Sequence, residues 1–519
     1  MATIAENLAV SLDELKRLQD AGKVAIRAGD LSRTHRERLL KNGFLKEVIK
    51  GWFLLSSPEQ KDGDSTGWYA SYWDFCAQYL RIRFGSDWIV SPEQSLLLHA
   101  GNRSIPGQMI VRTKSNTNYI VELPFHTSLF LIKAELPPSE NRTEYRGIHL
   151  YGLVPALIQA SPNAYLRDTV DIRTALLQIK DASEILAPLL DGGQSTVAGR
   201  LAGAFRNVGK NRIADTLLAT MRDAGYDVRE TDPFGEKMSL TLAPHESSPY
   251  CIRIRLMWEA MRKSIVEVFP QAPGIPQNRK DYMSKVEAIY ATDAYHSLSI
   301  ERYQVTPELI ERVRSGKWDG KNKVEDRNAR DAMAARGYWE AFQSVSESVK
   351  KILDRENAGK VVDADHGAWY RRLFAPSVAV GLLKASDLAG YRTHQVYIGN
   401  SQHVPLNTDA LRDAMPVLME LLQREPHAGV RAVLGHFIFV FIHPYMDGNG
   451  RMARFLMNAM LASGGYPWTV IPVEKRAQYM KTLEQASVGQ NIGPFAKFIA
   501  DLVRKGLEGH PEAVLKQER

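Results

Sequence analysis

Residues 443–451 read His-Pro-Tyr-Met-Asp-Gly-Asn-Gly-Arg, and a second arginine, Arg454, follows one helical turn later. The stretch brings together an imidazole, a carboxylate and two guanidinium groups. An apolar run, 437–442, precedes it, and a second helical pattern follows it. This layout predicts a helix, a polar loop and the N-terminus of another helix.

The second half of the stretch has the chemistry of an anion site. The glycines at both ends of Gly448-Asn449-Gly450 can adopt positive φ and expose consecutive backbone N–H groups at the start of a helix. The dipole of that helix favours a phosphate in the same place. Arg451 and Arg454 are three residues apart, so they share one helix face and can both donate to phosphate oxygens.

The first half supplies a base and a metal ligand. Asp447 offers hard carboxylate oxygens beside the anion site, which suit a Mg²⁺ that bridges two phosphates. His443 is placed to take a proton from an incoming nucleophile. Taken singly, these features are also common as a helix end, a turn and a solvated helix face. Their combination at fixed spacing favours a nucleotidyl or phosphoryl transferase.

Residues 443–454 match the HPFx[D/E]GNGRxxR motif of the Fic family, and the resemblance extends over about 280–505. Tyr445 stands where the family usually has Phe, so an aromatic anchor for the loop is kept. The resemblance implies the helical Fic core and the transfer of AMP from ATP onto a protein hydroxyl, with release of pyrophosphate. Mg²⁺ is the implied cofactor, and ATP is the co-substrate.

The resemblance also implies roles for single residues. His443 would be the general base and Asp447 the metal ligand, and the extended segment that ends at Pro405 would be a hairpin flap that pins a target peptide by strand addition. The nucleotide would be bound by Gly448, Asn449, Gly450, Arg451 and Arg454, and the flap would bind the target through Val396, Tyr397 and Ile398, with Asn400-Ser401 as its tip.

A second element of the family lies upstream, on a helix expected near 285–301. Ser297-Leu298-Ser299-Ile300-Glu301 matches the inhibitory [S/T]xxxE[G/N] pattern. The resemblance implies that Glu301 pairs with Arg454 and blocks a productive pose of the γ-phosphate. Arg302 departs from the pattern, because the family has Gly or Asn there. The alternative is that Glu301 is a capping or surface residue.

The N-terminal part, 1–57, is expected to hold two or three helices and then a hairpin that turns at Lys50-Gly51. This order resembles the winged-helix domain of AbiEi-type antitoxin regulators. Basic residues predominate between 33 and 50, which suits a phosphate backbone. The residues expected nearest the groove are Arg33, Thr34 and Arg36. The alternatives are a solvated surface and a protein-interaction module.

The central part, 58–250, is expected to be an α+β domain of unknown role, because strand-like alternation gives way to helical patterns near residue 168. The segment 203–211 resembles a phosphate-binding loop, but it fails the GxxxxGK[ST] spacing and has Asn211 in place of the hydroxyl residue. We expect it to be part of a helix and its end.

Composition limits the remaining choices. A chain of 519 residues is too long for one core, and 44% hydrophobic with 24% charged residues is typical of a globular protein. Only Cys76 and Cys251 are present, which argues against a disulfide framework or a thiolate metal site. No long apolar run or secretory signal is evident, so we expect a cytoplasmic protein without a membrane partner. The net charge of +7 is too small to identify a partner.

The sequence therefore predicts a multidomain, mainly α chain. It comprises a winged helix at 1–57, the α+β domain at 58–250, and a helical Fic core at 251–519 with a small β-hairpin flap. The predicted function is that of a protein adenylyltransferase autoinhibited by Glu301, whose partners are ATP, a target protein and DNA. The alternatives are a DNA-binding regulator that uses the pocket as a nucleotide sensor, and an enzyme that removes AMP. The target, the base preference and the oligomeric state, a homodimer included, are left open.

Overall fold

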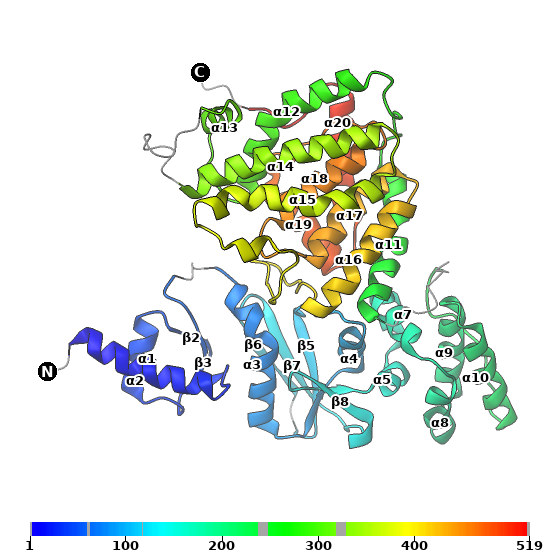
Figure 1. Cartoon of the computed structure of the whole chain (residues 1–519). Coiled ribbons are helices and arrows are strands. Elements are labelled where there is room, and N and C mark those ends of the chain that lie inside the picture. The colour runs from blue at the N-terminus through cyan, green and yellow to red at the C-terminus, as the bar shows by residue number, and fades with distance from the viewer. Residues whose placement is uncertain (1–2, 60–62, 117, 237–247, 318–328, 516–519) are drawn as a thin grey trace. The chain divides into compact units, whose positions relative to one another are not determined.

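The computed structural model describes residues 3–59, 63–116, 118–236, 248–317 and 329–515. Contacts divide the chain into two compact units (Figure 1). The first unit is Met1–Thr241 together with Tyr397–Val404, and the second is Leu242–Val396 together with Pro405–Arg519. In the part of the chain that is described, no helix has the length and hydropathy needed to cross a membrane.

The first unit begins with two helices and a small antiparallel sheet. The elements are α1 (Ile4–Asp20), β1 (Ile26–Arg27), α2 (Arg33–Lys41), β2 (Leu45–Ile49) and β3 (Trp52–Leu55), with strand order β1-β3-β2. Thr3 and Ser32 cap the two helices, and Gly51 takes a φ of 79° in the turn between β2 and β3. The predicted helices and hairpin are present, and the winged helix as such stays a prediction.

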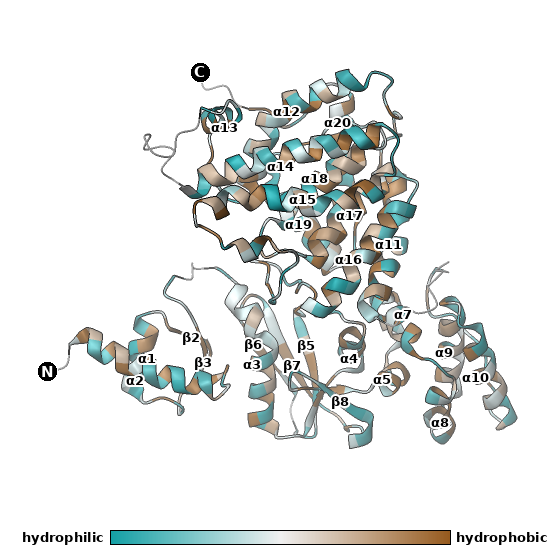
Figure 2. Ribbon diagram, viewed as in Figure 1, coloured by the Kyte–Doolittle hydropathy of each residue, from teal (hydrophilic) through white to brown (hydrophobic). Residues whose placement is uncertain are grey.

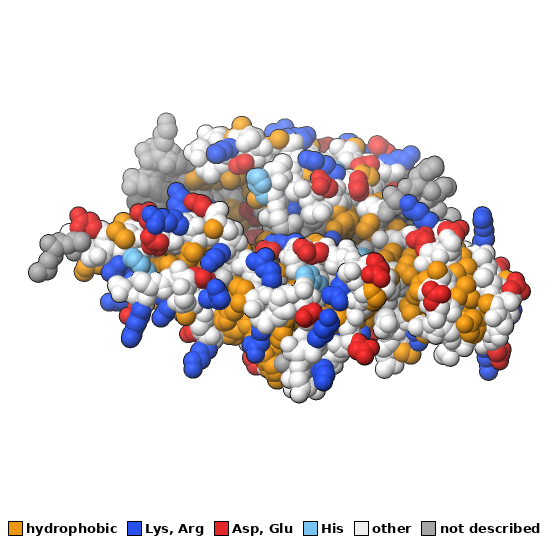
Figure 3. All heavy atoms as spheres, turned by 90° about the horizontal axis from the view of Figure 1, so that it is seen from below, with side chains coloured by type: hydrophobic (Ala, Val, Ile, Leu, Met, Phe, Trp, Pro, Cys, Tyr) orange, Lys and Arg blue, Asp and Glu red, His pale blue; other side chains and the backbone are white. Residues whose placement is uncertain are grey.

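Several basic side chains of α2 are engaged inside this part of the fold. Arg36 Nη1 donates to the carbonyl of Ala28 at 2.6 Å, and Arg38 Nη1 donates to the carbonyl of Asn7 at 2.7 Å. Arg33 and Thr34 are exposed, and Arg33 pairs with Glu37. Figure 3 shows Lys and Arg side chains interspersed with Asp and Glu on the face it presents. DNA binding therefore stays a prediction, with Arg33 and Thr34 as the side chains available for it.

A four-stranded sheet follows, with α3 and α4 around it. The elements are α3 (Thr66–Phe84), β4 (Trp88–Val90), α4 (Pro92–His99), β5 (Gln108–Thr113), β6 (Asn118–Leu123) and β7 (Thr127–Lys133). The strand order is β4-β5-β7-β6; β5 and β7 are parallel and the other pairs antiparallel. Aromatic residues of α3, among them Trp68, Tyr72 and Phe75, form the core with one face of the sheet.

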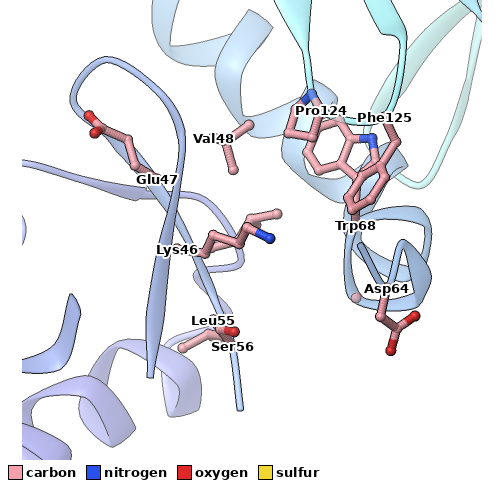
Figure 4. A pocket seen from close by; sticks show the side chains of 11 residues that line it. Lys46, Glu47, Val48, Leu55, Ser56, Asp64, Trp68, Pro124 and Phe125 are labelled. Atoms are coloured by element: carbon pink, nitrogen blue, oxygen red, sulfur yellow. The ribbon is translucent and has the colours of Figure 1, made fainter. Parts of the chain in front are cut away.

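A pocket in the same unit lies between the β2–β3 hairpin and α3 (Figure 4). Its lining includes Lys46, Trp68 and Phe125. Its volume of about 30 Å³ is enough for water and too small for an organic ligand.

The rest of the first unit is a short hairpin and a group of helices. The elements are η1 (Ser139–Asn141), β8 (Arg142–Tyr145), β9 (Ile148–Tyr151), α5 (Leu153–Gln159), α6 (Pro162–Arg167), α7 (Thr169–Gln178), α8 (Ser183–Asp191), α9 (Ser195–Asn207) and α10 (Asn211–Asp223). The segment that resembles a phosphate loop is helical at Gly203, where a Cβ would overlap the carbonyl of Thr231. Lys210 Nζ donates to the carbonyl of Leu177 at 2.9 Å. The structural interpretation of this segment is therefore correct.

The segment Tyr397–Val404 belongs to the first unit, although both of its neighbours in sequence belong to the second. The backbone N–H of Ile105 donates to the carbonyl of Gln402 at 2.8 Å, and the N–H of Asn400 donates to Ser65 Oγ at 3.0 Å. Val404 is buried in the aromatic core of the unit.

The expected β-hairpin at 396–405 is wrong, because no strand forms there. The reason is that backbone groups which a hairpin would pair with each other are bonded to residues 65 and 105 instead. A turn does form at Asn400-Ser401: Asn400 has a φ of 60°, and the N–H of Ser401 donates to the carbonyl of Ile398.

The second unit is helical. Its elements are α11 (Pro249–Val268), α12 (Arg279–Ile300), α13 (Pro307–Arg314), α14 (Ala329–Leu353), α15 (Ala358–Ala379), η3 (Ala385–Leu388), α16 (Thr408–Arg424), α17 (Ala428–Ile442), α18 (Asn449–Ala462), η4 (Val473–Lys475), α19 (Arg476–Ser487) and α20 (Gly493–Leu507). Helix α17 is largely apolar (Figure 2) and almost completely buried. Helix α18 contacts α12, α14, α15 and α17, so its N-terminus is surrounded by elements that can supply side chains.

Candidate active site

The loop between α17 and α18 has a fixed backbone. Helix α17 ends at His443, which has the left-handed φ of 56°, and α18 begins after Gly448, which has a φ of 82°. Both groups of the Asn449 side chain bond the backbone of Tyr445: the Tyr445 N–H donates to Oδ1 at 2.9 Å, and Nδ2 donates to the carbonyl at 2.8 Å. The Tyr445 ring stacks on Tyr370 with centroids 3.8 Å apart. The loop is thus anchored by an aromatic residue, as expected, and locked by Asn449.

His443 has the features of a base. Its Nδ1 lies 3.1 Å from the carbonyl of Val440, which can only accept a hydrogen bond, so Nδ1 carries the proton and Nε2 keeps its lone pair. Burial lowers the pKa of His443 to about 4, and the charge of Arg392 acts in the same direction. The imidazole is therefore neutral at pH 7.

Arg392 also holds the backbone of the base. This buried side chain donates from Nε to the carbonyl of His443 at 2.8 Å, from Nη1 to the carbonyl of His394 at 2.9 Å, and from Nη2 to the carbonyl of Leu406. Arg392 could not be identified from the sequence, because nothing in the local pattern indicates that its guanidinium reaches the carbonyls of Leu406 and His443, which lie 14 and 51 residues away.

The N-terminus of α18 presents unpaired donors. Among the described residues, no acceptor is found for the backbone N–H groups of Asn449, Gly450 and Arg451. Arg451 Nε and Arg454 Nη1 are also buried without a hydrogen-bond partner in that part of the chain. Buried unpaired donors are costly, about 1–3 kcal/mol each, and an anion would satisfy them together.

Gly448 is the position in this loop that a larger residue cannot fill. A Cβ there would lie 2.7 Å from Phe374 Cε2, and its positive φ disfavours other residues.

Asp447 lies at the rim of this site. Its side chain is 67% exposed, Oδ1 accepts from the N–H of Gly448 at 2.6 Å, and Oδ2 lies 3.2 Å from Arg451 Nη2. The described residues contain no group of three or more His, Cys, Asp or Glu side chains that could hold a metal ion. One exposed carboxylate still fits Mg²⁺, because this ion keeps several waters and takes further oxygens from phosphates.

The segment with the inhibitory pattern, residues 297–301, lies against Arg454. Arg454 Nη2 donates to Glu301 Oε1 at 2.8 Å and to the carbonyl of Ser297 at 3.0 Å, while Nε donates to Ser297 Oγ at 2.8 Å. The Arg454 side chain is 3% exposed. Glu301 also lies over the start of α18, because a Cβ at Gly450 would overlap Glu301 Oε1. The structure thus brings Ser297, Glu301 and Arg454 together at the anion site.

Arg302 stands where the inhibitory pattern has Gly or Asn, and its backbone adopts the left-handed conformation that these residues favour. Arg302 has a φ of 67°, the conformation that Gly and Asn adopt most readily, and its side chain is exposed. The turn leads to Tyr303, whose ring lies over Arg451. Sequence analysis gave Tyr303 and Phe374 no role, since neither belongs to a motif.

The remaining predicted residues are divided between the two units. Val396 belongs to the second unit, whereas Tyr397 and Ile398 belong to the first. Arg33, Thr34 and Arg36 also belong to the first unit.

Comparisons with known proteins identify the same segment. Residues 366–461 match the model of the Fic/DOC family. "Protein adenylyltransferase Fic" of Drosophila willistoni is 31% identical over 233 residues, which are 43% of this chain and 42% of that protein. The protein of the same name from Drosophila grimshawi is 41% identical over 122 residues, which are 23% of this chain and 25% of that protein.

Among solved structures, a Fic-1 chain from C. elegans has a TM-score of 0.37 and 18% identity, and the match covers 67% of this chain and 97% of that one. The chain spans less than half the length of the curated relatives named above. The part of the chain that is similar to the Fic/DOC family, residues 366–461, contains the loop between α17 and α18.

Proposed function

We propose that the chain is a protein adenylyltransferase that transfers AMP from ATP to a Ser, Thr or Tyr hydroxyl of a target protein. The observation that carries the proposal is the group of unpaired buried donors at the start of α18, next to a neutral His443. A triphosphate satisfies such donors, and the base lies on the same loop. The names of the relatives support this activity over other phosphate chemistry.

In the proposed reaction, the target hydroxyl oxygen attacks the α-phosphorus of ATP. The bond from that phosphorus to the bridging oxygen breaks, pyrophosphate leaves, and the hydroxyl proton passes to His443 Nε2. The unpaired N–H groups of 449–451 and the two arginines bind the phosphates. Asp447 would hold Mg²⁺, which neutralises phosphate charge when bound.

The site is proposed to be closed by Glu301. The guanidinium of Arg454 cannot donate to Glu301 and to a γ-phosphate with the same N–H groups, so the carboxylate competes with the nucleotide. Opening requires the Glu301–Arg454 pair to break, which a buried, hydrogen-bonded geometry opposes.

Labelling with α-³²P-ATP tests the activity. Glu301→Gly is expected to label proteins in a lysate at least about tenfold more than the unaltered chain, since it frees Arg454. Glu301→Gln keeps the shape of the side chain and removes its charge, so its labelling is expected to be between that of Glu301→Gly and that of the unaltered chain. Adding His443→Ala to Glu301→Gly removes the base and is expected to abolish the label. Equal label with Glu301→Gly and with His443→Ala would refute the proposal.

A metal requirement is tested separately. In the Glu301→Gly background, EDTA is expected to stop labelling, and added Mg²⁺ is expected to restore it. Asp447→Ala is expected to raise the Mg²⁺ concentration needed for half-maximal label, because it removes the protein's own oxygen ligand. Label that is insensitive to EDTA would rule out this role.

A further inference from the structure

The guanidinium of Arg451 is buried and has two aromatic rings near it. Its Cζ lies 5.1 Å from the ring centroid of Tyr303 and 5.0 Å from that of Phe374. The Arg451 side chain is 1% exposed, and its Nε has no hydrogen-bond partner in the described part of the chain. A phosphate therefore cannot reach this guanidinium until part of its cover moves away.

Only one of the two rings is free to leave. Phe374 is 5% exposed on α15 and lies directly against Gly448, so it is part of the packed core. Tyr303 is half-buried on the short segment between α12 and α13, and the backbone hydrogen bond found for it within the described residues runs from its N–H to the carbonyl of Leu298.

The position of Tyr303 is coupled to that of Glu301. The left-handed turn at Arg302 directs the carboxylate of Glu301 to Arg454 and the ring of Tyr303 to Arg451. A second cation lies near the ring, since Arg330 Cζ lies 5.3 Å from its centroid. A ring with guanidinium groups near it is attracted to both by its quadrupole.

We propose that Tyr303 is a second closing residue, whose ring covers Arg451 and competes with the phosphate that Arg451 binds. The inference rests on the proposed nucleotide site and adds a regulatory contact to it. The segment 301–303 then blocks both arginines of the loop, one by a carboxylate and one by an aromatic face. Release of either contact loosens the other, because the same turn carries both.

ATP binding to the full chain, measured by calorimetry without a target protein, tests the role of the ring. Tyr303→Ala is expected to tighten ATP binding by about 3- to 30-fold, since the ring no longer competes for Arg451. Tyr303→Phe keeps the ring and is expected to stay within about twofold of the unaltered chain. Tyr303→Leu keeps apolar volume without a π face and is expected to behave like Tyr303→Ala, which covers the case that the alanine variant does not fold.

Tyr295→Ala is a matched control, because Tyr295 is a half-buried tyrosine of α12 with no contact to either arginine among the interactions found. It is expected to leave ATP affinity unchanged. In the Glu301→Gly background, the Tyr303→Ala effect is expected to persist with a smaller size, since the turn is already loosened.

Equal affinities for Tyr303→Ala, Tyr303→Leu and Tyr303→Phe would overturn the role of the ring. This outcome differs from failure of the proposed function. If Glu301→Gly binds ATP but transfers no AMP, the transferase proposal falls, and the Tyr303 comparison still decides whether the ring covers Arg451. If no variant binds ATP, both proposals are refuted.

Discussion

At the scale of single residues, His443 depends on groups that are distant in sequence. Its left-handed backbone is held by Arg392, and its tautomer is fixed by Val440. Arg392 is 2% exposed, and the interactions found for its guanidinium are with carbonyl oxygens. Burial lowers the pKa of Arg392 to about 10, so the group still carries its charge at neutral pH.

Replacement of Arg392 tests this positioning role. Arg392→Gln is expected to lower the free energy of unfolding by about 2–4 kcal/mol, because three carbonyls, of which that of Leu406 is buried, lose a charged donor. In the Glu301→Gly background it is also expected to lower kcat at least about tenfold with little change in the KM for ATP, since the base is displaced and the phosphate donors are not.

Arg431→Gln serves as the control for Arg392. Arg431 is a partly buried arginine that donates to the Glu425 carbonyl and to Ser463 Oγ, away from His443. It is expected to lower stability and to keep kcat. A similar fall in kcat for both variants would show that Arg392 acts on stability alone.

The pKa of His443 predicts the acid limb of the pH–rate profile. Because burial lowers this pKa to about 4, the imidazole stays a base as the pH falls past 6.5, and kcat/KM of the Glu301→Gly chain is expected to decline only near pH 4. The negative charge of Glu301 raises the pKa of His443, so removal of Glu301 lowers this pKa further. An acid limb centred near 6.5 would contradict this.

At the scale of secondary-structure elements, α14 and α15 pack so closely that one position requires glycine. A Cβ at Gly337 would overlap the carbonyl of Leu373, which is the residue before Phe374. Close packing of these helices thus supports the ring that lies under Gly448 and beside Arg451.

Gly337→Ala is expected to destabilise the chain by about 1–3 kcal/mol, because two backbones must separate, despite the better helix propensity of alanine. Chemical denaturation measures the change. Gly367→Ala is the matched control in α15, where a Cβ would meet only the flexible end of Arg371. It is expected to be neutral or stabilising. If Gly337→Ala left the free energy of unfolding unchanged, α14 and α15 could separate without loss of stability, and the packing argument would be wrong.

At the scale of the whole molecule, the segment Tyr397–Val404 belongs to the first unit, although the residues on both sides of it in the sequence belong to the second. Val404 is buried at 8% exposure in the aromatic core, and backbone hydrogen bonds at Asn400 and Gln402 hold the segment there. This segment was expected to bind a target by strand addition. Its backbone groups at Asn400 and Gln402 are instead hydrogen-bonded to Ser65 and Ile105 of this chain.

Val404→Asp is expected to release this segment, because it places a charge in an apolar core. Limited proteolysis of the full chain, with the first cuts mapped by mass spectrometry, should then show faster cleavage within 397–404. Asn400→Gly is the control: its left-handed turn suits glycine, so cleavage there is expected to stay slow. First cuts elsewhere in both variants would contradict the anchoring role.

The helical part of the fold could be predicted well from local patterns. The helix expected near 285–301 and the two helices expected on either side of the polar loop correspond to α12, α17 and α18. The path of 396–405 could not be predicted, and the hairpin expected there is wrong, because extended apolar residues do not reveal which backbone partners they will find. Arg36 illustrates the same limit, since a basic side chain expected to face DNA donates to Ala28 instead.

The sequence by itself determined the chemistry of the loop, because the base, the carboxylate, the glycines and the arginines are close in the chain and one helix start orients them. It also indicated the partner of Arg454, since Glu301 completes a recognisable pattern at the end of α12. Only the tertiary structure decided what surrounds these groups. Arg392, Tyr303 and Phe374 reach the loop from elements that are distant in sequence, and such contacts depend on how helices pack rather than on local spacing.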